Sequence, residues 1–115
     1  MASKIYILIK DSVDLGHAMV AAAHAPLVYS KHIEETATRD KPHHDCLKKE
    51  WNEWSTNSFR KVVCKVTEEE FKEAKTIELP HVVLTESGLD NQEVALVFGP
   101  QEEWPKFFKY LKLYK

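Results

Sequence analysis

The sequence contains few cysteines and no long hydrophobic run. Its 115 residues include only Cys46 and Cys64, which are not closely spaced, so a disulfide scaffold and a four-cysteine zinc site are excluded. The longest apolar runs, residues 5–9 and 94–98, are far shorter than the roughly 20 residues of a membrane-spanning helix. No signal-peptide pattern follows Met1. We therefore expect a cytoplasmic protein in a reducing compartment, without a membrane partner.

An excess of positive charge is also missing. The 16 Lys and Arg residues against 18 Asp and Glu residues give a net charge of -2, whereas domains that bind nucleic acid are usually basic. Any contact with nucleic acid therefore requires a local patch. Lys106, Lys109, Lys112 and Lys115 repeat at a spacing of three, which is typical either of such a patch or of an ordinary solvated helix face.

The residues that are present predict one globular α/β domain spanning residues 1–115, since 43% are hydrophobic and 30% are charged. Apolar runs predict strands over residues 4–10, 59–66, 81–85 and 93–98, with the first buried on both faces. Helical patterns separate the early strands, and a turn-rich segment joins the last two. We expect a four-stranded mixed β-sheet with helices on both faces, in the order β-α-α-β-α-β-β-α.

The helices have recognisable start signals and faces. Ser12 or Asp14 can cap the first helix, and Pro26 predicts a kink or a break within it. Thr67 and Glu70 have the spacing of a capping box at the start of the third helix. A last helix is expected from residue 101 or 104 to residue 111. The apolar period of the first helix predicts an inward face made of Leu15, Met19, Ala22, Pro26, Tyr29 and Ile33.

Several ordered segments resemble the type II peptidyl-tRNA hydrolases, which cleave the ester between a peptide and the 3′ end of tRNA. The resemblance covers nearly the whole chain. Its segments are the strand KIYILIK, the Gly16 turn into a helix with Ala23-His24-Ala25, the strand KVVCKV, the Glu86-Ser87-Gly88 turn, Gly99-Pro100 and Leu111-Lys112-Leu113-Tyr114. The resemblance implies hydrolysis of peptidyl-tRNA or a related aminoacyl ester without a cofactor. Together with the apolar Trp51 and Trp54 region, it also implies a homodimer.

The first helix departs from the family pattern of a lysine followed one turn later by a glutamine. Aligned on Ala23-His24-Ala25, the chain has His17 in place of the lysine and Ala21 in place of the glutamine. A gapless alignment from the first strand instead places Met19 and Ala23 at these positions. Both alignments lose the lysine and the glutamine.

The family's Asp-Ala-Gly-x-Thr turn is also altered. Glu86 replaces the aspartate, Ser87 the alanine and Asp90 the threonine. Gly88 is retained, and we expect it to supply a positive φ or a close approach.

The remaining side chains predict a general base near the start of the first helix. His17 is largely neutral near pH 7 because an unperturbed imidazole has a pKa of about 6.5, and Glu86 can orient its ring. Backbone N–H groups at the helix start can stabilise an oxyanion. The positions expected to bind substrate are Gly16, Gly88, Asp90 and Lys10. In the alternative interpretation, His17 is an ordinary exposed residue of a first helical turn.

His24 lies nearly two helical turns after His17 and therefore on the same face. We interpret it as a partly buried structural histidine. His43, His44 and Cys46, with His32 nearby, are residue types that bind zinc, but adjacent histidines rarely supply two ligands to one ion, and we expect no metal site.

Two functions from different classes remain open at this stage. One is an ester hydrolase. The other is a non-catalytic binding or regulatory module that keeps the fold, which the missing lysine and glutamine and the acidic Asp90 favour. A hydrolase or transferase for another small molecule is a third possibility, since a fold does not fix a function.

Overall fold

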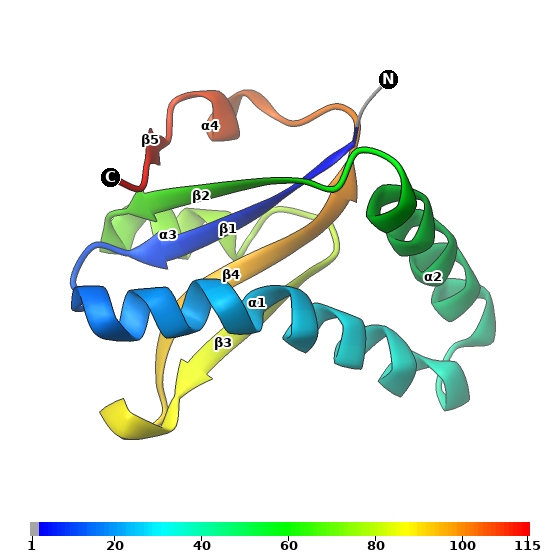
Figure 1. The fold of residues 1–115 in the computed structure, drawn as a ribbon, viewed down its shortest axis with the longest axis horizontal. Coiled ribbons are helices and arrows are strands. Elements are labelled where there is room, and N and C mark those ends of the chain that lie inside the picture. The colour runs from blue at the N-terminus through cyan, green and yellow to red at the C-terminus, as the bar shows by residue number, and fades with distance from the viewer. Residues whose placement is uncertain (1–2) are drawn as a thin grey trace.

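A mixed five-stranded sheet forms the centre of the computed structural model, which describes residues 3–115 (Figure 1). Its strand order is β3-β4-β1-β2-β5; β1 and β2 are parallel, and the other neighbours are antiparallel. The predicted α/β class and mixed sheet are confirmed, but the number of strands is five rather than four. The strands are β1 (Lys4–Lys10), β2 (Arg60–Val66), β3 (His81–Glu86), β4 (Gln92–Gln101) and β5 (Lys112–Leu113).

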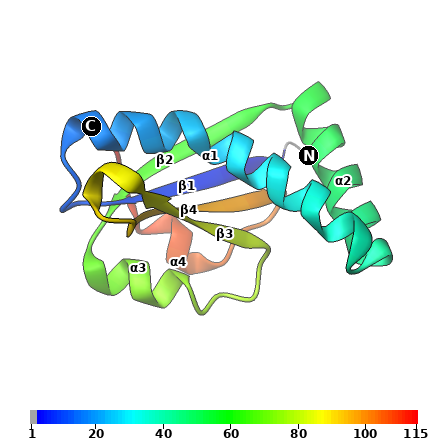
Figure 2. The same ribbon diagram turned by 90° about the horizontal axis from the view of Figure 1, so that it is seen from below.

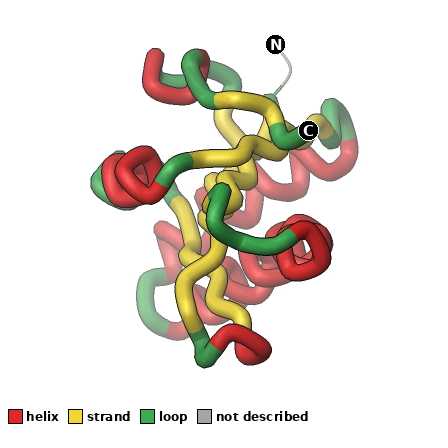
Figure 3. Tube along the Cα trace, turned by 90° about the vertical axis from the view of Figure 1, so that its left-hand side faces the viewer, coloured by secondary structure: helices red, strands yellow, loops and turns green. Residues whose placement is uncertain are grey.

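Helices cover both faces of this sheet (Figures 2 and 3). One face carries α1 (Leu15–Glu35) and α2 (Lys41–Thr56), and the other carries α3 (Glu68–Ala74) and α4 (Lys106–Lys109). Central strand β1 alternates between the two cores, with Ile5, Ile7 and Ile9 on the α1 side and Tyr6 and Leu8 on the α3 side. Burial of this strand on both faces is therefore confirmed. Within residues 3–115, none of the helices is both long and apolar enough to cross a membrane.

The C-terminal segment differs from the sequence prediction. Helix α4 is only four residues long, because β4 continues through Gly99 and Pro100 to Gln101 and Pro105 then occupies the N-cap position. The chain instead adds β5, which pairs with β2 through the opposed residues Lys65 and Lys112. A two-residue strand has no periodicity that a sequence could reveal. The C-terminal lysines consequently do not share one helix face.

Helix α1 buries a different face from the one that its large apolar residues predict. Its buried residues are Ala18, Ala21, Ala25, Tyr29 and Ile33, whereas Leu15 is 63% exposed and Met19 is 65% exposed. Small side chains let the first half of the helix lie close to the sheet, so the prediction for Leu15 and Met19 is wrong. Pro26 does not break the helix, which continues to Glu35.

Two local features predicted from the sequence, a capping box and a hairpin, are confirmed. The Thr67 hydroxyl accepts from the Glu70 N–H at 3.1 Å, and the Glu70 carboxylate accepts from the Thr67 N–H at 2.8 Å. Strands β3 and β4 form the expected hairpin, joined by a 3-10 turn, Ser87–Leu89, and by Asp90 and Asn91. These last two residues adopt φ values of 54° and 59°.

Candidate active site

The first turn of α1 holds a histidine in a fixed orientation. Asp14 is the N-cap residue, and its Oδ2 accepts from the His17 backbone N–H at 3.3 Å. Its Oδ1 lies 2.7 Å from Nδ1 of the same histidine. A neutral imidazole that donates from Nδ1 to the carboxylate keeps Nε2 as a free acceptor. The helix cap thus also selects the tautomer that a general base requires.

The same contact shifts the pKa of both partners. The hydrogen bond that His17 donates to Asp14 raises the pKa of His17, partial burial opposes this shift, and the negative charges of Asp14 and Glu86 add to it. The hydrogen bond from His17 lowers the pKa of Asp14. The carboxylate therefore stays ionised, and the imidazole, whose side chain is 34% exposed, is a stronger base than a free histidine.

The β3–β4 turn brings Gly88 against this imidazole. A Cβ atom built on Gly88 would lie 3.2 Å from His17 Nε2 and 3.6 Å from Glu86 Oε1. Residues from α1 and from the end of β3 thus meet at one glycine. The expected close approach at Gly88 is confirmed, but its φ is not positive, and the left-handed conformations fall on Asp90 and Asn91 instead.

The ring of His17 is oriented by Asp14 and not by Glu86 as the sequence suggested. Within residues 3–115, no hydrogen bond joins Glu86 to His17, and Glu86 affects the histidine only through its charge. From the sequence, Asp14 was expected only as a helix cap. The three-residue spacing between Asp14 and His17 could have revealed the pair, because side chains at i and i+3 are neighbours at a helix start.

A cleft of about 440 Å³ lies between α1 and the β3–β4 hairpin, beginning about one helical turn from His17. Its wall is about equally polar and apolar, and the polar residues are His24, Thr85, Glu86, Ser87 and Asn91. His24 is exposed on this wall, so the expected partly buried structural role is wrong. The apolar lining consists of Val20, Ala21, Val28, Val83, Leu84 and Val94.

Two other residues expected to bind substrate, Gly16 and Asp90, do not line the cleft. Gly16 is exposed beside the cap, where a Cβ would approach only Asp14 Oδ2, at 3.5 Å. Asp90 is exposed at the far end of the turn and does not line the cleft.

Lys10 lies on the opposite face of the sheet from the cleft. Its Nζ pairs with Glu68 at 3.2 Å and sits 4.6 Å from the centre of the Phe71 ring. The sequence placed Lys10 near the substrate because it ends β1. Strand alternation turns its side chain to the α3 side, away from the cleft. A role of Lys10 in substrate binding stays a prediction.

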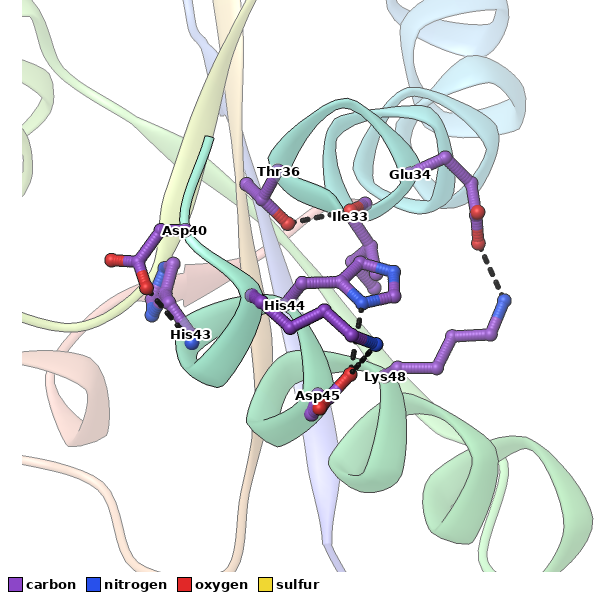
Figure 4. Close-up of polar contacts among 9 residues, drawn as sticks. Ile33, Glu34, Thr36, Asp40, His43, His44, Asp45 and Lys48 are labelled. Atoms are coloured by element: carbon purple, nitrogen blue, oxygen red, sulfur yellow. Dashed lines mark hydrogen bonds and ion pairs between the residues drawn. The ribbon is translucent and has the colours of Figure 1, made fainter. Parts of the chain in front are cut away.

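The histidines at the start of α2 make contacts with nearby acidic residues of the same helix start (Figure 4). Asp40 caps α2 by accepting from the His43 N–H at 3.2 Å, and Asp45 Oδ1 lies 3.2 Å from His44 Nδ1. Lys48 pairs with Glu34 and so ties α2 to the end of α1. No group of three or more potential metal-binding side chains occurs in the part of the chain that the structure describes.

A basic hollow lies along β5, at the same end of the molecule as the start of α1 (Figures 1 and 2). It is lined by Lys65, Lys112, Leu113 and Lys115. The Nζ atom of Lys65 also lies 4.7 Å from the centre of the Tyr114 ring. Two lysines of the C-terminal row thus join a third from β2 through strand pairing rather than through a helix face.

Comparison with models of known protein families gives no match, and a search of curated proteins gives no significant match. The resemblance to type II peptidyl-tRNA hydrolases therefore stays a prediction.

Proposed function

We propose that this protein hydrolyses the ester of peptidyl-tRNA or of a related aminoacyl ester, with His17 as general base. The observation that carries the proposal is the Asp14–His17 pair, whose Nε2 lies against Gly88 near an open cleft. A base with its ring oriented by a second group is the usual arrangement for activating water.

The reaction follows from these positions. Nε2 of His17 takes a proton from water as the water oxygen attacks the acyl carbon, and the resulting oxyanion accepts hydrogen bonds from unpaired N–H groups at the start of α1. The Gly16 N–H is one such donor, because the first N–H groups of a helix have no partner within it. The C–O ester bond then breaks, and the leaving oxygen receives the proton from His17.

The basic hollow supports a tRNA substrate. Phosphates require cations, and the chain as a whole has a net charge of -2. Lys65, Lys112 and Lys115 provide a local concentration of positive charge at the same end of the molecule as His17.

The proposal is tested by measuring release of the acyl group from N-acetylaminoacyl-tRNA and aminoacyl-tRNA. We expect His17→Gln to lower kcat/KM by about 10²–10⁴-fold, the usual contribution of a general base. His43→Gln changes an exposed histidine of α2, which lies at the opposite end of the molecule from the start of α1 (Figure 1), and is the matched control that should act like the wild type. Wild-type turnover that survives His17→Gln unchanged would overturn the mechanism.

A second candidate is a non-catalytic binding or regulatory module. It is favoured by the cleft itself, whose lining holds a carboxylate and no lysine or arginine, so that phosphate has no counter-charge there. Absence of turnover by the wild type on both ester classes would support this candidate over the hydrolase.

The homodimer also stays a prediction. The sequence placed its interface at Trp51 and Trp54, but Trp54 is only 2% exposed and packs within the chain. Helix α1 instead exposes Leu15, Met19 and Leu27. Exposed apolar residues of this kind are typical of contact surfaces, and sedimentation equilibrium measures whether two copies associate.

A further inference from the structure

The cleft beside His17 has a specific chemical character. Its wall combines apolar side chains of α1, β3 and β4 with several polar groups, of which Glu86 is the only carboxylate and His24 the only imidazole. Its volume of about 440 Å³ lies toward the lower end of the range for small-molecule sites, roughly 300–1,000 Å³. A wall with a carboxylate and no lysine or arginine suits a small amino-acid-like ligand better than a nucleotide, whose phosphates would find no counter-charge there.

Glu86 is a carboxylate without a cationic partner. Within residues 3–115 it forms no ion pair or side-chain hydrogen bond, although it is half-buried at the end of β3. Another acid of the hairpin, Glu93, is paired with Lys75 at 2.7 Å. A half-buried carboxylate in an apolar surround is stabilised by a cationic hydrogen-bond donor. No lysine or arginine lines the cleft, and the only imidazole of its lining, His24, forms no hydrogen bond with Glu86 within residues 3–115. An ammonium group of a ligand can therefore supply this donor.

The geometry also fixes where this cation lies relative to the reacting bond. Glu86 Oε1 and His17 Nε2 both lie within 4 Å of one position, that of a Cβ on Gly88. In an aminoacyl ester the α-ammonium group is two bonds from the acyl carbon. A ligand can therefore place its ammonium on Glu86 while its acyl carbon is near the water that His17 activates.

We infer that the cleft recognises an apolar amino acid with a free α-ammonium group, so that the preferred substrate is an aminoacyl ester rather than an N-blocked peptidyl ester. This inference rests on the proposed function and narrows its substrate class. The apolar side chain occupies the valine-lined wall, and Glu86 binds the ammonium. An N-acyl group removes the positive charge and leaves Glu86 unpaired, and an acidic side chain is repelled by it.

The test is a binding measurement that does not require turnover. Titration of the wild-type protein with L-leucinamide, N-acetyl-L-leucinamide and aspartic acid α-amide, followed by NMR, should show leucinamide binding about tenfold or more tighter than the other two. Glu86→Gln should abolish the preference for the free amine. Asp90→Asn, in the same turn but outside the cleft, is the matched control and should keep it.

A second variant tests the apolar wall. Val20 is 41% exposed and lines the cleft, so Val20→Asp leaves the core intact. We expect it to weaken leucinamide binding by about tenfold. Undetectable binding of leucinamide to the wild type, equal binding of the N-acetylated compound, or an unchanged preference in Glu86→Gln would each overturn the inference.

Failure of the inference and failure of the proposed function are distinguishable. If His17-dependent turnover occurs but both ester classes react equally and both amides bind equally, the hydrolase stands and the specificity is wrong. If leucinamide binds with the expected preference and no ester is hydrolysed, the recognition site stands and the hydrolase is wrong.

Discussion

Asp14 serves two structural purposes with one carboxylate. One oxygen caps α1, and the other holds the imidazole of His17. A cap residue has a backbone fixed by the helix start, so the imidazole that it contacts is held more firmly than a side chain on a free loop. At the residue scale, the proposed role of His17 as a base therefore depends on Asp14.

We expect Asp14→Asn to move the pH profile of the proposed hydrolysis. His17 must be neutral to act as a base, and Asp14 raises its pKa, so activity falls as the pH drops through a pKa above 6.5. Removing the negative charge should lower this pKa and shift the acid limb of kcat/KM to lower pH, with a smaller maximum because the ring is less well oriented.

The shift is measured from kcat/KM between about pH 5 and pH 9 and, independently of activity, from the NMR titration of the imidazole. Asp11→Asn is the control, since Asp11 is an exposed acid of the same loop. An imidazole pKa that is the same in Asp14→Asn and in the wild type would contradict the assignment.

Gly88→Ala tests the close approach of the turn to the imidazole. The added methyl group would lie 3.2 Å from His17 Nε2, which is too close unless the ring moves by a few tenths of an ångström. We expect kcat/KM to fall by about tenfold, because small displacements of a catalytic group are costly. The unfolding temperature should change little, since Gly88 is exposed and its φ is not positive. A large drop in stability would show that the turn, and not the histidine, is what the methyl group disturbs.

At the scale of elements, the site depends on how closely α1 lies on the sheet. The alanines of its first half and Gly99 of β4 leave room for that approach. Gly99 is where Tyr29 of α1 meets the sheet, and a Cβ there would overlap the tyrosine hydroxyl and lie 2.5 Å from Cζ. The glycine is required by this contact rather than by its backbone conformation.

We therefore expect Gly99→Ala to destabilise the fold by about 1–3 kcal/mol, the usual cost of overpacking a core. Tyr29→Phe in the same chain should restore part of this stability, because it removes the overlapping oxygen but leaves the ring. Urea unfolding of the two single variants and the double variant gives the coupling. Strictly additive effects of the two changes would contradict the proposed contact.

At the scale of the whole molecule, charge is separated between surfaces. The cleft contains an unpaired acid, while three lysines gather along β5. This separation is consistent with a substrate that has a phosphate-rich part and a small acyl part, held at different places on one end of the molecule.

We expect Lys112→Glu and Lys115→Glu each to weaken tRNA binding. Each should also reduce the slope of log K against log salt concentration by about 1 for every phosphate that the lysine neutralises in the wild type. Lys72→Glu on α3 makes the same change in net charge away from the hollow and is the control. Fluorescence anisotropy across a range of NaCl concentrations measures both quantities. Equally weakened binding by the control would mean that net charge, and not this surface, governs binding.

The sequence by itself determined the features that neighbouring residues decide. The apolar run of β1, the capping box of Thr67 and Glu70, and the β3–β4 hairpin were all predictable, because each depends on residues within a few positions of one another. The candidate base His17 and the turn residues Glu86 and Gly88 were also identifiable one by one.

Only the tertiary structure decided which of these residues meet. Gly88 reaches His17 across about 70 positions of the sequence, and nothing local specifies that contact. Strand alternation turned Lys10 away from the site, and β5 exists only because β2 offers it a free edge. The large apolar residues Leu15 and Met19 predicted the wrong buried face for the start of α1. The buried positions there are alanines, because the helix lies too close to the sheet for larger side chains. Tertiary packing therefore placed Gly88 against the imidazole and left Glu86 without a hydrogen bond to it, whereas the Asp14–His17 contact is local to the helix start.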